Sequence, residues 1–136
     1  MTETGLGSKI VLIADDEAAI RLLVSATLTS DQYSVLRAAD GEEAWRLIRR
    51  HHPAVAILDW EMPGYEGLEL TAVIKGDPQL WDMTVIMLTG RTDRADREAG
   101  ARAAADLYLI KPFSPKDLFD AVERALSSNG PSADSD

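Results

Sequence analysis

The stretch Lys9-Ile-Val-Leu-Ile-Ala-Asp-Asp-Glu17 joins an almost wholly apolar run to three consecutive acids. A short run that is apolar on both faces predicts a strand buried in a parallel sheet. Residues 54–58 and 84–88 have the same character, and each of these runs also stops at a polar residue, Asp59 or Thr89. The sequence therefore predicts a parallel sheet whose strands end in polar side chains.

Two further runs, 33–37 and 106–110, mix polar with apolar residues, as strands at the edges of a sheet do. Helical patterns lie between and after the runs, so that strand and helix alternate five times. Such an alternation predicts βαβ units with right-handed crossovers. We therefore expect an α/β fold, a single doubly wound five-stranded parallel sheet with five helices.

The expected helices show capping residues and apolar stripes. Asp40 followed by Glu43 is typical of a capping box, and Ser114 followed by Pro115 is typical of a helix start. The segment 93–103 is a weaker helix whose apolar face consists of alanines. The stripes of the other helices are Ile20, Leu23, Val24 and Leu28; Ala44, Leu47 and Ile48; Leu70, Val73 and Ile74; and Leu118, Ala121, Val122, Ala125 and Leu126.

Composition limits the size of the protein and the kinds of partner it can bind. The 136 residues, 46% of them hydrophobic, suffice for one domain, which we expect at 9–127 with flexible termini at 1–8 and 128–136. The formal net charge of −9 argues against direct binding of nucleic acid and favours a partner with a positive patch or a bound cation. A plain acidic surface that keeps the protein in solution is the alternative.

The chain shows no sign of export or of membrane insertion. It has no cysteine, no apolar run near the roughly 20 residues of a membrane span, and no secretory signal at its amino terminus. We expect a cytoplasmic protein that does not bind membranes.

Polar residues follow four of the predicted strands. Asp15 and Asp16 come after the first, Asp59 after the third, Thr89 after the fourth and Lys111 after the fifth. Taken singly, each has an ordinary explanation as a helix cap, a turn residue or a solvated lysine. In an open α/β sheet, however, ligands bind at the carboxyl ends of the strands. Their joint occurrence there predicts a site.

The chemistry of these residues points to a metal ion. Two carboxylates about 4 Å apart repel each other by about 4 kcal/mol at an effective dielectric near 20, and three need protonation or a divalent cation. Oxygen ligands without nearby Cys or His favour Mg²⁺, with Mn²⁺ as the alternative. An Asp carboxylate beside such an ion is a nucleophile toward phosphorus, and Lys111 and Thr89 could take the other phosphoryl oxygens.

Five motifs in this order resemble the receiver domains of two-component response regulators over about residues 9–127. The motifs are Ala14-Asp15-Asp16-Glu17, Leu58-Asp59, Met62-Pro63-Gly64, Leu88-Thr89-Gly90 and Lys111-Pro112-Phe113. The resemblance implies a flavodoxin-like fold with strand order 2-1-3-4-5. It also implies phosphorylation by a histidine kinase, a phosphotransfer protein or a small phosphodonor. It implies slow autodephosphorylation, no enzymatic activity on other substrates, and a monomer or weak homodimer.

The same resemblance assigns roles to single residues. Asp59 is the implied phosphoacceptor, and Asp15, Asp16, Asp59 and the backbone carbonyl of Glu61 are the implied metal ligands. Thr89 is the implied switch hydroxyl, and Lys111 is implied to bind the phosphoryl group. Gly90 and Pro112 are implied supporting residues, and the Lys111–Pro112 peptide bond is implied to be cis. Tyr108 matches the aromatic residue that turns inward when Thr89 moves, although it could be an ordinary edge-strand aromatic.

Some positions depart from the family pattern. Trp60 is bulkier than the expected aliphatic residue, and Gly90 replaces a common alanine. We hypothesise that Glu61 and Arg91 tune the lifetime of the phospho-aspartate. We expect segment 93–103, strand 106–110 and the last helix to form the output face, where Phe119 and Arg124 could contact a partner.

Three other functions remain open at this stage. A phosphatase of the haloacid dehalogenase type also phosphorylates a strand-end Asp, but it needs a second Asp two residues later, where this chain has Glu61. A flavin-binding module shares the fold, yet it needs a phosphate-binding loop where this chain has Asp15 and Asp16. A receiver-like binding module that is not phosphorylated is the third possibility.

Overall fold

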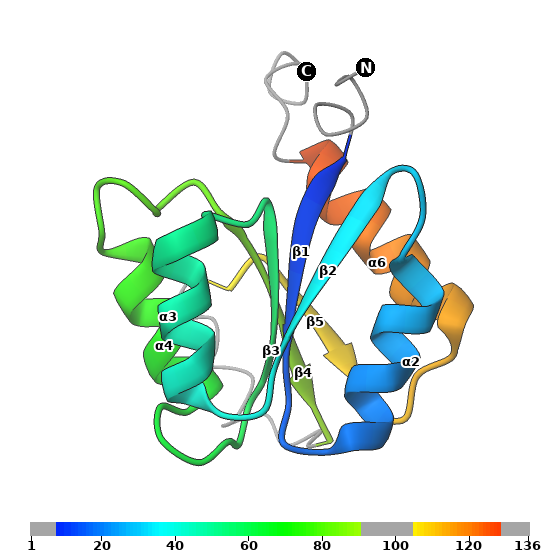
Figure 1. Cartoon of the computed structure of the whole chain (residues 1–136), viewed down its shortest axis with the longest axis horizontal. Coiled ribbons are helices and arrows are strands. Elements are labelled where there is room, and N and C mark those ends of the chain that lie inside the picture. The colour runs from blue at the N-terminus through cyan, green and yellow to red at the C-terminus, as the bar shows by residue number, and fades with distance from the viewer. Residues whose placement is uncertain (1–7, 91–104, 129–136) are drawn as a thin grey trace.

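The computed structural model describes residues 8–90 and 105–128, which form five strands and four helices (Figure 1). The strands are β1 (Lys9–Ala14), β2 (Tyr33–Ala38), β3 (Val55–Asp59), β4 (Thr84–Thr89) and β5 (Leu107–Ile110). The helices are α2 (Ala18–Leu28), α3 (Gly41–His51), α4 (Gly67–Lys75) and α6 (Pro115–Ser128). The fifth predicted helix, 93–103, lies outside the described residues, and so do the predicted flexible termini except Ser8 and Ser128.

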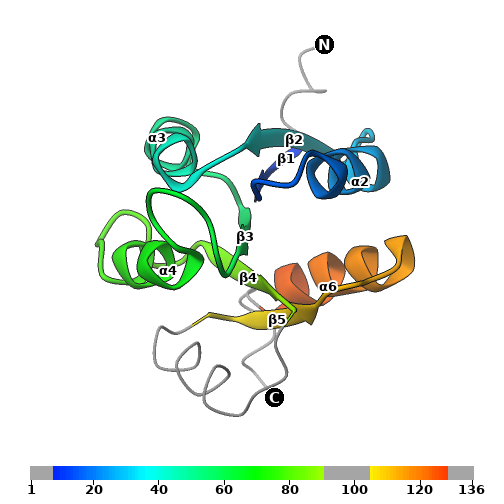
Figure 2. The same ribbon diagram turned by 90° about the horizontal axis from the view of Figure 1, so that it is seen from below.

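The strands form one parallel sheet in the order β2-β1-β3-β4-β5, which confirms the expected topology. The register places Ala14 opposite Leu58, and Thr89 opposite Ile110. The carboxyl ends of the strands therefore lie at one edge of the sheet, which faces the viewer in Figure 2. Residues that follow different strands in the sequence are brought together at this edge.

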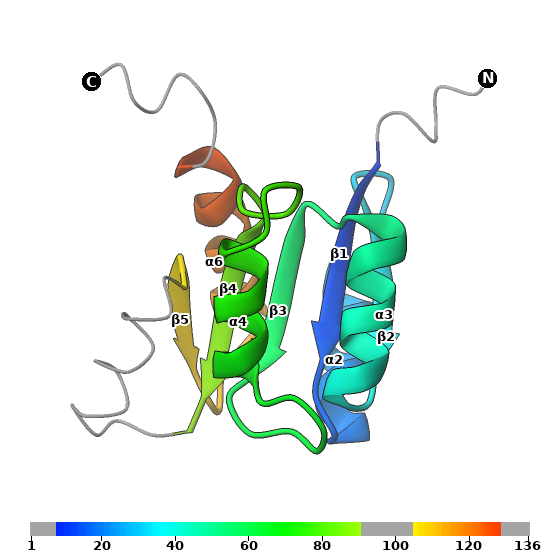
Figure 3. The same ribbon diagram turned by 90° about the vertical axis from the view of Figure 1, so that its left-hand side faces the viewer.

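Alternate residues of the central strands pack on opposite faces of the sheet. Ile13, Ile57 and Leu88 join the cluster that includes residues of α2 and α6. Their neighbours Leu12 and Leu58 join the cluster with α3 and α4, which cover the other face (Figures 1 and 3). All five side chains are fully buried, and each contributes roughly 1.5–3 kcal/mol of apolar burial. Packing on both faces therefore holds the central strands in place, and with them the residues that follow at their carboxyl ends.

Side-chain caps begin two helices, as the sequence predicts. At the start of α3, Asp40 Oδ1 accepts a hydrogen bond from the Glu43 N–H at 2.8 Å. Before α6, the Asp117 N–H donates to Ser114 Oγ at 3.0 Å and the Ser114 N–H donates to Asp117 Oδ2 at 3.1 Å. These bonds satisfy N–H groups that a helix leaves without intrahelical partners.

The buried face of α4 differs from the predicted stripe, because Val73 is 42% exposed. The buried residues are Gly67, Leu70, Thr71 and Ile74. The Gly67 N–H donates to the Trp60 carbonyl at 3.1 Å, and a Cβ on Gly67 would lie 2.2 Å from the Asp59 carbonyl oxygen. Only glycine allows the first turn of α4 to approach the end of β3 this closely, and this approach determines which face of α4 is buried.

Candidate phosphoacceptor and cation site

Three carboxylates converge at the carboxyl edge of the sheet, as predicted. Asp15, Asp16 and Asp59 each offer an oxygen atom, and these three atoms lie within 4.8 Å of one another. Asp15 is fully buried and Asp59 is 7% exposed, whereas Asp16 is exposed. Asp59 is the last residue of β3, and the other two follow β1, so the parallel pairing of β1 with β3 creates the cluster.

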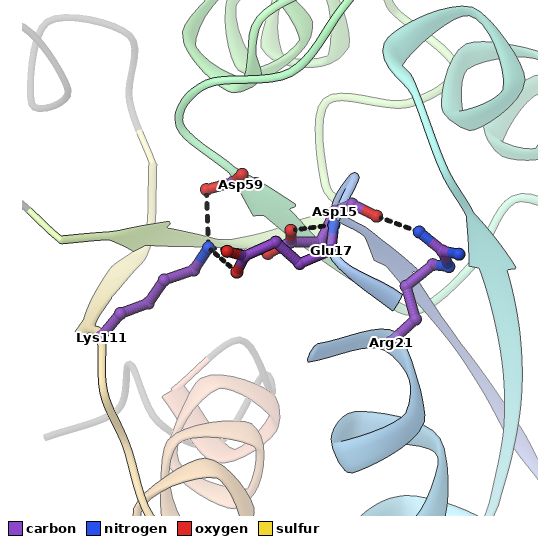
Figure 4. Close-up of polar contacts among 5 residues, drawn as sticks. All are labelled: Asp15, Glu17, Arg21, Asp59 and Lys111. Carbon is purple, nitrogen blue, oxygen red and sulfur yellow. Dashed lines mark hydrogen bonds and ion pairs between the residues drawn. The ribbon is translucent and has the colours of Figure 1, made fainter. Parts of the chain in front are cut away.

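The Lys111 ammonium lies among these acids, as Figure 4 shows. Its Nζ is 2.9 Å from Asp15 Oδ2, 3.3 Å from Asp59 Oδ1 and 3.5 Å from Glu17 Oε1. The Lys111 N–H donates to the Thr89 carbonyl at 2.8 Å, which attaches the lysine to the end of β4. The Lys111–Pro112 peptide bond is cis, as predicted. A single ammonium thus lies within ion-pairing distance of three carboxylates.

Burial and charge perturb the pKa values of both partners. Burial, reinforced by the negative charge of Asp15, raises the pKa of Asp59 to about 6, although Lys111 opposes this shift. Burial lowers the pKa of Lys111, but the nearby carboxylates of Asp15 and Asp59 outweigh burial and raise it overall. Lys111 is therefore charged at neutral pH, yet its charge does not restore Asp59 to the pKa of an ordinary carboxyl group.

One oxygen of Asp15 is left for a further ligand. Its Oδ1 accepts a hydrogen bond from the Glu17 N–H at 2.9 Å. Its Oδ2 is buried and accepts no hydrogen bond from the residues that the structure describes, even though the Lys111 ammonium is 2.9 Å away. A buried carboxylate oxygen without a hydrogen bond is costly, and a hard divalent cation would relieve that cost. The three aspartates therefore fit a metal ion that prefers oxygen ligands.

A cavity of about 360 Å³ opens over the cluster. It is lined by Asp16, Glu17, Asp59, Trp60, Glu61, Thr89, Gly90 and Lys111. Six of these are predicted site residues, so the structure brings them to one place. Pro112 follows Lys111 directly and is outside the lining.

Tyr108 is separate from this cavity. It lines another hollow, of about 270 Å³, together with Asp117, Asp120 and Arg124 of α6. Burial raises the pKa of its hydroxyl. In this structure the tyrosine therefore lies beside α6 and outside the lining of the Asp59 cavity, so the predicted coupling of Tyr108 to Thr89 stays a prediction.

Two residues near the site were given no role from the sequence. Glu17 contacts Lys111 and bonds to Asp15, and its position directly after the aspartate pair was the only signal. Arg21 donates from Nη1 to the Asp15 backbone carbonyl at 2.8 Å (Figure 4). No sequence motif marks a contact with a backbone carbonyl. Arg91, named in the hypothesis on phospho-aspartate lifetime, lies outside the described residues.

Fold and site together define a doubly wound α/β protein with an acidic, lysine-containing site at the carboxyl edge of its sheet. The sequence profile of the response regulator receiver domain matches residues 11–123. The chain therefore belongs to the response regulator receiver domain family. This confirms the resemblance inferred from the five motifs.

Named relatives agree with this assignment. The chain is 41% identical over 116 residues to the protein named "Probable transcriptional regulator ycf27" of Porphyridium aerugineum, covering 85% of this chain and 47% of that protein. It is 36% identical over 123 residues to the phosphate regulon transcriptional regulatory protein PhoB of Pseudomonas aeruginosa, covering 90% and 54%. The chain thus spans about half the length of these relatives.

Solved structures show the same fold. The chemotaxis response regulator CheY4 of Vibrio cholerae superposes with a TM-score of 0.82 at 33% identity, covering 87% of this chain and 98% of that one. The signal receiver domain of a signal transduction histidine kinase from Syntrophus aciditrophicus superposes with a TM-score of 0.81 at 29% identity, covering 88% and 91%. Similar domains thus occur in more than one kind of signalling protein.

The relatives' names qualify the expectation that nucleic acid is not a partner. Two of the proteins above are named as transcriptional regulators, which conflicts with that expectation if it is extended to a longer protein. The expectation rests on the charge of these 136 residues alone and is not confirmed. No helix in the described ranges has the length and apolar character needed to cross a membrane.

Proposed function

We propose that this chain is a phosphorylation-dependent signalling switch that accepts a phosphoryl group on Asp59 with Mg²⁺ bound at Asp15, Asp16 and Asp59. The backbone carbonyl of Glu61 is a further proposed ligand, and Mn²⁺ could replace Mg²⁺. The donor is a histidine kinase, a phosphotransfer protein or a small phosphodonor. The observation that carries the proposal is the convergence of the three carboxylates around Lys111.

In the proposed reaction, a carboxylate oxygen of Asp59 attacks phosphorus. The bond between phosphorus and the donor atom breaks, and the electron pair stays on the donor, which takes up a proton. With a pKa of about 6, Asp59 is ionised at neutral pH and so can act as the nucleophile. Lys111, already within 3.3 Å of Asp59 Oδ1, neutralises charge on the incoming phosphoryl oxygens. A bound divalent ion supplies further neutralisation of the carboxylates and the phosphoryl group.

The reverse process is slow hydrolysis. A water oxygen attacks phosphorus, phosphate departs, and Asp59 recovers its carboxylate. Glu61 and Trp60 both line the cavity over Asp59, which supports a role for Glu61 in the lifetime of the phosphorylated state. The chain would thus catalyse only its own phosphorylation and dephosphorylation and would not be an enzyme acting on other substrates.

We further propose that segment 93–103, β5 and α6 form the output face. Ile110 at the end of β5 is 42% exposed and Phe119 on α6 is 40% exposed, so apolar surface is available there. Amide hydrogen exchange in residues 90–110 should change on phosphorylation, and unchanged exchange would rule this face out. We expect a cytoplasmic monomer or weak homodimer, with no contact of these residues with nucleic acid.

The test is incubation with acetyl phosphate and Mg²⁺ followed by intact-mass measurement. Wild type should gain about 80 Da, one phosphoryl group. Asp59→Asn should gain nothing, while Asp31→Asn, at an exposed position outside the site, should behave as wild type. If wild type gained no more mass than Asp59→Asn on incubation, the chain would be a binding module that is not phosphorylated at this residue.

A further inference from the structure

Arg21 reaches back from α2 to the loop that carries the acid pair. Its Nη1 donates to the backbone carbonyl of Asp15 at 2.8 Å, and the contact is partly buried. In Figure 4 it lies on the opposite side of Asp15 from Lys111. Arg21 therefore contacts the backbone of a proposed metal ligand without lining the cavity over Asp59.

The bond completes a set of contacts that fix Asp15. The Asp15 N–H donates to the Ala38 carbonyl at 3.1 Å, and Oδ1 accepts from the Glu17 N–H at 2.9 Å. The carbonyl belongs to the first residue beyond β1, where the pairing with both neighbouring strands has ended. This carbonyl accepts the hydrogen bond from Arg21, while the side-chain Oδ2 lies 2.9 Å from the Lys111 ammonium.

The Asp15 carbonyl belongs to the planar peptide group that links Asp15 to Asp16. Holding its oxygen fixes the orientation of that plane, and the plane determines the directions in which the two side chains leave the backbone. We propose that Arg21 is a positioning residue, which holds this peptide so that the carboxylates of Asp15 and Asp16 meet a divalent cation. The inference rests on the proposed cation site.

The charge of Arg21 makes the direction of the change in Mg²⁺ affinity informative. A guanidinium close to a cation site repels Mg²⁺, so removing the charge alone would tighten Mg²⁺ binding. Removing the hydrogen bond loosens the ligands, and partners that orient metal ligands typically affect affinity by about 10–100-fold. Positioning and simple repulsion therefore predict opposite changes in the same measurement.

The experiment is a calorimetric titration of the metal-free protein with MgCl₂, without any phosphodonor. Arg21→Met should weaken Mg²⁺ binding about tenfold relative to wild type. Arg21→Lys, which keeps the charge and one donor, should show a smaller loss. Arg46→Met is the matched control: this arginine is exposed on α3, and its replacement should leave the affinity unchanged. Thermal melts in EDTA show whether each variant folds.

Unchanged or tighter Mg²⁺ binding by folded Arg21→Met would overturn the proposal, because positioning would then not outweigh the charge repulsion that the same substitution removes. If the methionine variant does not fold, Arg21→Lys decides: weaker binding supports positioning, and wild-type affinity overturns it. Absence of Mg²⁺ binding in wild type would instead refute the proposed cation site, so the two failures are distinguishable.

Discussion

Replacing Asp59 with asparagine should stabilise the metal-free protein at neutral pH and much less at acidic pH. Burial and the charge of Asp15 raise the pKa of Asp59 to about 6 from an ordinary value of 3.8. The folded state thus binds a proton more tightly than the unfolded state does. Stability is therefore lost as the pH rises through the interval from about 4 to 6, because the unfolded chain gives up the proton first.

The size of this effect follows from the two pKa values. Because the pKa of Asp59 is about two units higher in the folded state, ionisation of this carboxyl lowers the free energy of unfolding by about 3 kcal/mol at pH 7.5. At pH 4.5 the same two pKa values give a loss of about 1 kcal/mol. Because the carboxyl borders a cavity that admits water, 3 kcal/mol is an upper bound. We therefore expect Asp59→Asn to add about 1–3 kcal/mol to the free energy of unfolding at pH 7.5, and less than half of that at pH 4.5.

Urea unfolding in EDTA at the two pH values measures the difference directly. Asp31→Asn is the control, since this exposed acid lies outside the site, and its effect should stay within about 0.5 kcal/mol at both pH values. Adding roughly 10 mM MgCl₂ should shrink the gain at pH 7.5, because the bound ion would neutralise Asp59 in wild type. A gain from Asp59→Asn that did not change with pH would refute the argument.

Two further substitutions test the contacts that support the site and the sheet. Gly67→Ala should lower the free energy of unfolding in urea by about 2–3 kcal/mol, because the added Cβ would lie 2.2 Å from the Asp59 carbonyl oxygen. Gly90→Ala is the control, since a Cβ there meets no atom of the described structure within 4 Å. Equal losses in the two variants would contradict the packing argument. Lys75→Met should cost about 1–2 kcal/mol, because Lys75 Nζ donates to the Met83 carbonyl at 2.6 Å and to Asp106 Oδ2 at 2.9 Å. Lys116→Met is the control: it breaks an exposed ion pair on α6 and should leave the free energy of unfolding unchanged. A Lys75→Met variant as stable as wild type would show that the hydrogen bonds of Lys75 do not hold β4 and β5 together.

The sheet and most of the site could be predicted because they depend on local patterns. A strand buried on both faces must be apolar along its whole length, so 9–14 and 84–88 are recognisable without any knowledge of their neighbours. In a parallel sheet the polar residue after each such strand falls at the same edge. The positions of Asp59 and Thr89 followed from these two facts.

Other features depend on contacts between segments that the sequence does not specify. Val73 is exposed because Gly67 packs against the Asp59 carbonyl and thereby sets the rotation of α4. Tyr108 lines a hollow together with residues of α6, and this depends on how α6 packs against β5. Arg21 binds a backbone carbonyl, and any residue type at position 15 would offer the same acceptor. No motif could have indicated these three positions.

Lys111 alone would not suffice to operate the proposed switch if phosphorylation produced a nearly complete shift between two states. Shifting a two-state equilibrium from 1:99 to 99:1 needs about 5.5 kcal/mol of differential binding. A hydrogen bond to a charged group supplies about 1.5–3 kcal/mol, and Lys111 must give up contacts to Asp15 and Asp59 in order to bind a phosphoryl oxygen. We therefore expect a second contact that forms only in the phosphorylated state. Thr89 lines the same cavity at the end of β4, and its backbone carbonyl already accepts the Lys111 N–H, so the two residues can respond to the phosphoryl group as one unit.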